Sequence, residues 1–169
     1  MRDDADVTEP MPQPFSQREL RTALGCFATG VTLVTTLSKT GPLGMTVNSF
    51  ASVSLDPPLV LWSPARKSDR FPAFEAASHF AIHVLTEDQQ ALAERFARDG
   101  LDFSGIGTEE GVGGTPLLQE FAARFQCAHA AGHDGGDHLI VVGEVLSFEH
   151  RDARPLLYHK GGFAALGAS

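Results

Sequence analysis

The chain has 169 residues, of which 43% are hydrophobic and 20% charged, so it is long enough to bury a core within one domain. Its formal net charge of −8 argues against binding to nucleic acid or to an anionic membrane, since both need clustered Lys and Arg. No apolar run approaches the roughly 18 residues that span a bilayer, and the acidic, proline-rich N-terminus does not have the pattern of a signal peptide.

The first residues predict a tail followed by a helix. Residues 1–14 hold acids and prolines with little to bury, which indicates a disordered tail, and 15–169 are interpreted as a single domain. Ser16 and Glu19 have the spacing of a capping box, and the apolar residues after them predict a helix over 17–28.

The rest of the chain is rich in predicted strands. They cover 31–38, 45–55, 59–63, 79–85, 121–130 and 139–148. A short helix is predicted within 68–78 and a longer one over 87–98, opened by a capping box of Thr86 and Gln89. Residues 99–116 are glycine-rich and predicted to be irregular. Strands that follow one another, with two or three helices, favour a mainly β, antiparallel barrel or sandwich with peripheral helices.

The side chains of the predicted strand 45–55 alternate between two faces, and neither face carries a charge. We expect one of its faces to be core, and that face consists of Val47, Ser49, Ala51, Val53 and Leu55. The other face is mostly polar, and it consists of Thr46, Asn48, Phe50, Ser52 and Ser54. Buried polar groups left unpaired cost about 1–3 kcal/mol each, so these groups need partners. A neighbouring strand or water would provide them, and a flat ring with a donor and acceptor edge, such as a flavin, is the alternative.

Two other features bear on chemistry. Cys26 and Cys127 are interpreted as reduced thiols of a cytoplasmic protein, with one disulfide as the alternative. The segment HAAGHDGGDH, at 129–138, has His and Asp residues that suit a metal ion. Its glycines break any helix that would place His129 and His133 on one face, so no metal site is predicted.

Six segments of the sequence, taken in order, resemble the flavin reductase-like family over about residues 17–166. They are FATGVTLVTT, GMTVNSFASVSLDPPLVLW, FAIHVLTEDQQALAERFA, DFSGI, GGDHLIVVGEV and PLLYHKGGF. The resemblance implies an FMN-binding split β-barrel of Greek-key type, normally a homodimer with the flavin near the subunit interface. It also implies hydride transfer from NADH or NADPH to FMN or FAD, with reduced flavin diffusing to a separate monooxygenase.

The resemblance assigns most of the flavin contacts to the predicted second strand. These residues are Thr46, Val47, Asn48, Ser49, Phe50, Ala51, Ser52, Ser54 and Leu55. It matches a phosphate-binding turn to Lys67, Ser68, Asp69 and Arg70, whose cations, hydroxyl and expected helix N-terminus all suit a phosphate. A solvated surface turn is the alternative. Phe96 and Ala97 resemble a further cofactor-contacting stretch, in which Phe96 could equally be a core anchor.

The nicotinamide contacts that the resemblance implies come from the C-terminal third. Gly136-Asp137-His138 resembles the family's GDH motif, in which His138 is the catalytic residue that positions NAD(P)H and Asp137 orients the imidazole or the turn. Tyr158, Gly161 and Gly162 lie where relatives approach the pyridine nucleotide. A turn-capping histidine and a barrel-packing tyrosine are the alternatives. Two other functions stay open: a flavin-binding protein that reduces no free flavin, and a metal-dependent enzyme using the loop from His129 to His138.

Overall fold

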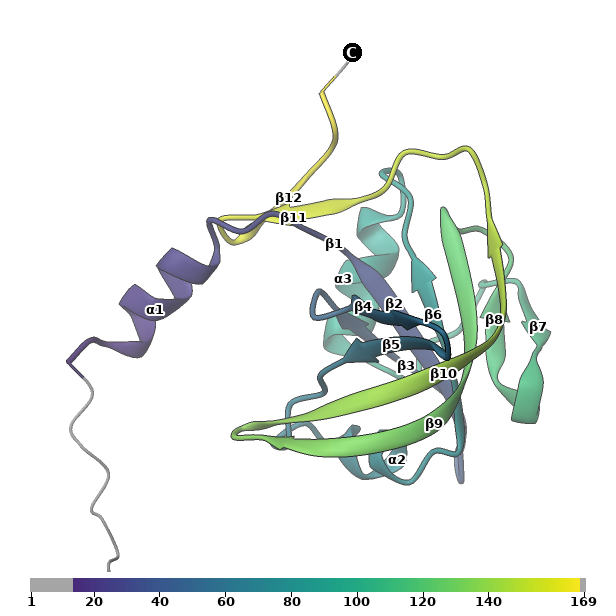
Figure 1. Cartoon of the computed structure of the whole chain (residues 1–169). Helices are drawn as coiled ribbons and strands as arrows, with labels where there is room; N and C mark the ends of the chain where they lie inside the picture. The colour runs from purple at the N-terminus through teal and green to yellow at the C-terminus, as the bar shows by residue number, and fades with distance from the viewer. Residues whose placement is uncertain (1–13, 168–169) are drawn as a thin grey trace, which may run out of the picture.

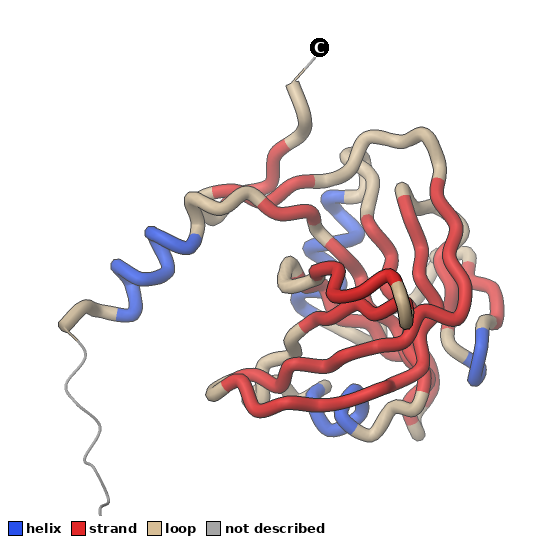
Figure 2. Tube along the Cα trace, viewed as in Figure 1, coloured by secondary structure: helices blue, strands red, loops and turns tan. Residues whose placement is uncertain are grey.

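The computed structural model describes residues 14–167, so the predicted tail lies outside the described residues except for Pro14. Strands account for most of the regular secondary structure (Figure 2), and every pairing between them is antiparallel. The largest sheet has seven strands in the order β3-β2-β6-β9-β10-β5-β4, beside the small sheets β1-β11-β12 and β7-β8. The predicted mainly β, antiparallel class with peripheral helices is confirmed.

The strands have the following bounds. They are β1 Thr29–Gly30, β2 Thr32–Ser38, β3 Gly41–Val47, β4 Ala51–Leu55, β5 Pro58–Trp62, β6 His79–Val84, β7 Thr108–Glu110, β8 Pro116–Leu118, β9 Ala123–Gly135, β10 His138–His150, β11 Leu157–His159 and β12 Gly162–Ala164. The helices are α1 Gln17–Leu24, α2 Phe71–Glu75 and α3 Gln90–Arg98, with a 3-10 turn at Val112–Gly114. No helix within residues 14–167 is long and apolar enough to cross a membrane.

Helix α1 begins as predicted and ends earlier. Both bonds of the capping box form, since Glu19 N–H donates to Ser16 Oγ at 3.2 Å and Ser16 N–H donates to Glu19 Oε2 at 2.8 Å. The helix stops at Leu24 instead of continuing to residue 28, because the chain tightens into i→i−3 bonds and then enters β1, which pairs with β11. Figure 1 shows α1 standing clear of the barrel, and none of its residues is buried.

Helix α3 begins later than predicted. One bond of its capping box is present, because Thr86 N–H donates to Gln89 Oε1 at 2.9 Å. The Thr86 hydroxyl instead donates to the Asp88 carboxylate, so the residues from Glu87 onward form a turn and the helix starts at Gln90. The short helix α2 is confirmed, with a proline in its first turn.

Three predicted boundaries are wrong. The strand expected over 45–55 is two strands, β3 and β4, separated by an irregular stretch at 48–50. The stretch 99–116 contains β7 and the start of β8. The segment left between the predicted strands 121–130 and 139–148 is the end of a hairpin, because β9 pairs with β10 almost to its tip, where Gly136 has a φ of 73°. Cross-strand pairing overrides the low strand propensity of glycine there.

The prediction of a core face on strand 45–55 is also wrong for most of its members. Val47 packs against the main core cluster, whereas Ala51 is exposed and Val53 and Leu55 have 49% and 94% of their surface exposed. The reason is position in the sheet, because β4 is an edge strand with a paired neighbour, β5, on one side only among the described strands. The core lies elsewhere, around Trp62 inside the barrel and around Phe96 of α3.

His83 is a fully buried histidine that the fold holds neutral. Its Nδ1–H donates to the Leu33 carbonyl at 3.0 Å, and Leu118 N–H donates to Nε2 at 3.1 Å, an arrangement that requires the uncharged tautomer. The pKa of His83 is lowered to about 4, chiefly by burial, while the Leu33 bond opposes the shift and the nearby Arg124 charge adds to it.

This histidine predicts a loss of stability in acid. Because the pKa of His83 is below its ordinary value of 6.5 in the folded state, its contribution is complete above pH 6.5 and declines towards pH 4. The loss should reach about 3 kcal/mol, and urea unfolding at pH 7.5 and pH 4.5 measures it. The non-titrating variant His83→Gln should show a shallower dependence on pH over this range. An equal dependence in both proteins would show that other groups cause the acid sensitivity.

Candidate functional site

The smaller of two cavities lies where β3 ends beside α3 and the β11–β12 hairpin, and it has a volume of about 480 Å³. Six residues predicted to contact the cofactors or nicotinamide line it together, namely Thr46, Val47, Asn48, Ala97, Tyr158 and Gly161. They come from three parts of the chain that are distant in sequence. The structure thus brings the end of the uncharged strand together with the C-terminal hairpin.

The walls of this small cavity are held by local packing. The Thr46 hydroxyl donates to the Ala93 carbonyl of α3 at 2.7 Å, which fixes the end of β3 against the helix. Tyr158 pairs with Thr29 of β1 and packs edge-on against Phe163, with ring centroids 5.5 Å apart. The result is a mainly apolar cavity with polar groups at the end of β3 and the charged side chains of Glu94 and Arg98 in its lining, and its apolar part suits a flat aromatic ring.

Phe96 is a core residue, which is one of the two roles that the sequence allowed for it. It is fully buried, and its ring lies 4.8 Å from that of Phe103. A Cβ added at Gly44 would stand 2.6 Å from the Phe96 ring, so only glycine permits the strand and the helix to approach this closely. Phe96 therefore supports the cavity wall from behind, while its neighbour Ala97 lines the cavity.

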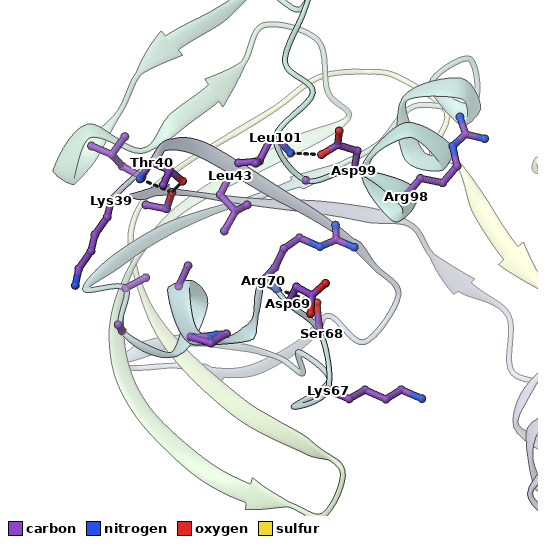
Figure 3. Close-up of a pocket in the computed structure, with 17 residues that line it drawn as sticks. Lys39, Thr40, Leu43, Lys67, Ser68, Asp69, Arg70, Arg98, Asp99 and Leu101 are labelled. Atoms are coloured by element: carbon purple, nitrogen blue, oxygen red, sulfur yellow. Dashed lines mark hydrogen bonds between the residues drawn. The ribbon is translucent and has the colours of Figure 1, made fainter.

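The predicted phosphate-binding turn borders a second, larger cavity. Lys67, Ser68, Asp69 and Arg70 all line this large cavity, whose volume is about 920 Å³ (Figure 3). The helix that follows the turn, α2, has only five residues, so its dipole offers an anion little and the side chains must do most of the binding.

Arg70 differs from the other residues of the turn, because its guanidinium forms hydrogen bonds with backbone carbonyls. It donates to the Gly44 carbonyl at 3.2 Å, to the Phe96 carbonyl at 2.5 Å and to the Ala97 carbonyl at 3.1 Å. Burial lowers the pKa of Arg70, and the charges of Asp99 and Asp69 oppose that shift. Arg70 therefore joins the turn to the end of α3 and to β3.

The predicted nicotinamide motif lies at the tip of the β9–β10 hairpin. The His138 Nδ1 lies 2.7 Å from Asp137 Oδ1, and this hydrogen bond lowers the pKa of the Asp137 carboxyl. Arg66 holds the tip to the segment before the phosphate turn: its N–H donates to the Asp137 carbonyl at 2.9 Å, and its guanidinium pairs with Asp134 at 2.8 Å. Asp137 is in position to orient the imidazole, and neither cavity is lined by Asp137 or His138.

Several other predicted contacts also lie outside both cavities. They are Ser49, Phe50, Ala51, Ser52, Ser54, Leu55, Phe96 and Gly162. The Ser49 hydroxyl accepts from Ser63 N–H at 2.9 Å, and Phe50 packs on Phe125 with ring centroids 5.6 Å apart. These two residues have the structural partners that the strand-pairing alternative describes.

Sequence reasoning missed Arg98, which lines both cavities. A signal was present, because Glu94, Ala97 and Arg98 are spaced as i, i+3 and i+4 and so share one face of α3. No group of three or more His, Cys, Asp or Glu side chains that could hold a metal ion occurs within residues 14–167.

Comparison with known proteins identifies the family. Residues 24–167 match the model described as flavin reductase like domain. The chain is similar to the FMN reductase (NADH) SmoA of Agrobacterium fabrum, with 56% identity over 153 residues that cover 90% of this chain and 88% of the relative. It is 42% identical over 156 residues to HsaB, the reductase subunit of a flavin-dependent monooxygenase of Rhodococcus jostii, covering 91% of this chain and 80% of HsaB.

A solved structure agrees with these relatives. The NADH:FAD oxidoreductase SgcE6 of Streptomyces globisporus superposes with a TM-score of 0.86 at 33% identity, covering 95% of this chain and 99% of SgcE6. The order of motifs in the sequence therefore predicted the family correctly, and the chain belongs to the flavin reductase like family.

Proposed function

We propose that this chain is an NADH-dependent flavin reductase that reduces FMN or FAD and supplies the reduced flavin to a separate monooxygenase. The observation that carries the proposal is the small cavity, where Asn48, Ala97 and Tyr158 meet in a chain 56% identical to an FMN reductase (NADH). Relatives named as reductase subunits or components of monooxygenases support the transfer of the reduced flavin to a separate monooxygenase. The reductase function, the enzyme class and the two cofactor types predicted from the sequence are confirmed by these relatives.

In this reaction the protein has to bind and orient the flavin and the nicotinamide. A bound flavin supplies the hydride acceptor at N5, and the nicotinamide supplies the hydride from C4. The chain has to hold one ring against the other and keep water away. The apolar wall around Tyr158 and Phe163 suits the second task, and the backbone groups at the end of β3 suit the first.

For the flavin phosphate we propose Lys67 and Ser68 as direct partners. The Lys67 side chain carries a positive charge and is exposed at the mouth of the large cavity, and the Ser68 hydroxyl lies next to it in the chain. Asp69 and Arg70 belong to the same turn, where the Arg70 guanidinium donates to the carbonyls of Gly44 and Ala97. Cations and hydroxyls are the usual protein partners of a phosphate.

For the nicotinamide we propose that His138 positions the ring, with Asp137 holding the imidazole. The variant His138→Ala should raise the KM for NADH about tenfold or more, while the Kd for FMN changes little, because the imidazole is not one of the groups that we propose for the flavin phosphate. Steady-state kinetics and a flavin titration measure the two constants. Equal losses in both would contradict this role.

We further propose that the protein is a cytoplasmic homodimer. The edge strand β4 exposes Val53 and Leu55, and β10, on the other side of β5, exposes Leu146 and Phe148 with 47% and 66% of their surface. Helix α1 adds a second exposed apolar surface. Apolar surface of this extent usually marks an interface, and a second copy would also cover the predicted contacts on β4. Both cysteines are free, which suits a reducing compartment.

Substitution on β4 and β10 tests the dimer. The double variant Leu55→Asp with Phe148→Asp should be a monomer, because two charges would be buried unpaired in the interface. Light scattering after size exclusion measures the mass. Val112→Asp, on the exposed 3-10 turn, is the matched control and should leave the mass unchanged. A dimeric double variant would place the interface elsewhere.

The reductase function is tested by NADH oxidation. Oxidation should require added FMN or FAD and should continue in the presence of a chelator, which excludes the metal-dependent alternative. Flavin binding without NADH oxidation would favour the flavin-binding protein that reduces no free flavin.

A further inference from the structure

The tip of the β9–β10 hairpin, which carries the predicted nicotinamide motif, reaches out from the sheet (Figure 1). The β10 side of this tip is joined by its backbone to the segment before the phosphate turn. Ala65 forms an antiparallel bridge with His138, and one residue further the Arg66 N–H donates to a tip carbonyl at 2.9 Å. On the other side, residues 130–135 of β9 pair with β10 alone among the described strands. The β9 side of the tip therefore has no second strand beside it.

The side chain of Arg66 reaches from the β10 side of the tip to the β9 side. Its Nε–H donates to the Gly136 carbonyl at 3.2 Å, and its guanidinium donates to the Asp134 carboxylate at 2.8 Å. Asp134 lies on β9, opposite Leu139 of β10. The same guanidinium lies 5.6 Å from the centre of the ring of Phe71, a buried residue of α2. One side chain thus connects both strands of the tip with the body of the protein.

The Arg66–Asp134 ion pair is exposed, so its contribution to folding is small. The side chains of Arg66 and Asp134 have 37% and 81% of their surface exposed, and exposed ion pairs add little to the free energy of unfolding. The backbone next to the pair is unusually free, because Gly135 and Gly136 follow Asp134 and have no Cβ. A weak interaction is enough to favour one arrangement of such a turn over another that differs little in energy.

From these contacts we propose that Arg66 and Asp134 are positioning residues for hydride transfer, whose ion pair fixes the hairpin tip so that His138 faces the nicotinamide. The inference rests on the proposed function of His138 and adds two residues that act through it. Neither side chain has to touch a cofactor. Because Arg66 directly precedes Lys67, the same pair also keeps the nicotinamide motif beside the phosphate turn.

Asp134→Asn tests the proposal, because it removes the charge of the pair while keeping the shape of the side chain. The variant should raise the KM for NADH about fivefold, and the Kd for FMN and the urea midpoint of unfolding should stay unchanged. A direct electrostatic effect on NADH has the opposite sign, since losing an acid favours an anionic ligand. An unchanged or lower KM for NADH would therefore overturn the proposal.

The matched control is an ion pair of similar length and exposure elsewhere on the surface. Arg151 and Glu120 lie 3.1 Å apart, and their side chains have 45% and 81% of their surface exposed. Glu120→Gln removes the same charge as Asp134→Asn, and it should leave the KM for NADH and the Kd for FMN unchanged. A rise in the KM for NADH as large as that of Asp134→Asn would show a general effect of surface charge and would overturn the proposal.

Action through His138 is tested in the His138→Ala protein. Adding Asp134→Asn to this variant should raise the KM for NADH no further, because the side chain that the pair positions is already missing. A second fivefold rise would mean that the ion pair acts on NADH independently of His138, which contradicts the proposal.

Amide hydrogen exchange of the free protein gives a readout that does not depend on activity. The peptide that contains residues 134–138 should exchange a few-fold faster in Asp134→Asn than in the wild type, and exchange at the wild-type rate would overturn the inference that the pair fixes the tip. Absence of flavin-dependent NADH oxidation in the wild type would instead contradict the proposed function, while hydrogen exchange still tests the effect of the ion pair on the tip.

Discussion

Arg70→Met is expected to lower the free energy of unfolding by about 3 kcal/mol and to weaken FMN binding at least about tenfold. The guanidinium donates to the carbonyls of Gly44, Phe96 and Ala97, which belong to two other elements. Methionine fills much of the same space but donates no hydrogen bond, so these carbonyls lose a charged partner. The end of α3 should then move relative to the phosphate turn. Urea unfolding and a fluorescence titration with FMN measure the two effects.

The matched controls for this prediction are Arg70→Lys and Arg18→Met. Lysine keeps the charge but cannot form the same set of bonds, so it should recover only part of the stability. Arg18 is exposed on α1, and its replacement should change neither quantity. If Arg70→Met unfolds like the wild type yet loses FMN and keeps riboflavin, then Arg70 binds the phosphate directly and is not a link between elements.

Ser68→Asp is the second change with a large expected effect. The variant should weaken FMN binding at least about tenfold, because it places a carboxylate where we propose the flavin phosphate. Riboflavin has no phosphate, so its affinity should stay within about twofold of the wild type. Titration of both flavins into the same preparation measures the ratio, with riboflavin serving as the internal control for folding.

Ser68→Ala distinguishes loss of a hydroxyl from the added charge. It should weaken FMN binding by a few-fold only, since one neutral hydrogen bond contributes about 1 kcal/mol. An Asp variant that binds FMN as well as the wild type would move the phosphate away from this turn. An equal loss of FMN and riboflavin would mean that the substitution disturbs the fold of the turn.

The sequence predicts those parts of the fold that depend on local chemistry. The capping box of Ser16 and Glu19 sets the start of α1, and the apolar runs that contain Val34 and Ile82 become β2 and β6 in the middle of the sheet. In both cases, the residues that decide the structure lie within a few positions of one another, or all face a core.

Features that depend on distant partners are not predicted. The alternation of residues 51–55 suggests a buried face, but burial depends on whether another element covers β4, and Val53 and Leu55 stay exposed to solvent within the described residues 14–167. The glycines around Gly132 suggest a loop, but β10 pairs with this segment and keeps it extended.

The same limit applies to the site. The motif order identifies the family, and six of the predicted contacts meet in the small cavity. The function of Arg70 as a link cannot be seen in the sequence, because its three acceptors come from two separate segments, around Gly44 and around Ala97. For Asp137 and His138, the two side chains are hydrogen-bonded to each other, but neither of them lines the small cavity.

The most direct test of the central claim is the rate of NADH oxidation measured as a function of FMN concentration with purified protein. We expect the rate to be negligible without flavin and to saturate as FMN is added, and His138→Ala should require more NADH at the same FMN concentration. Absence of flavin-dependent oxidation with either NADH or NADPH, in a protein that is folded, would contradict the claim.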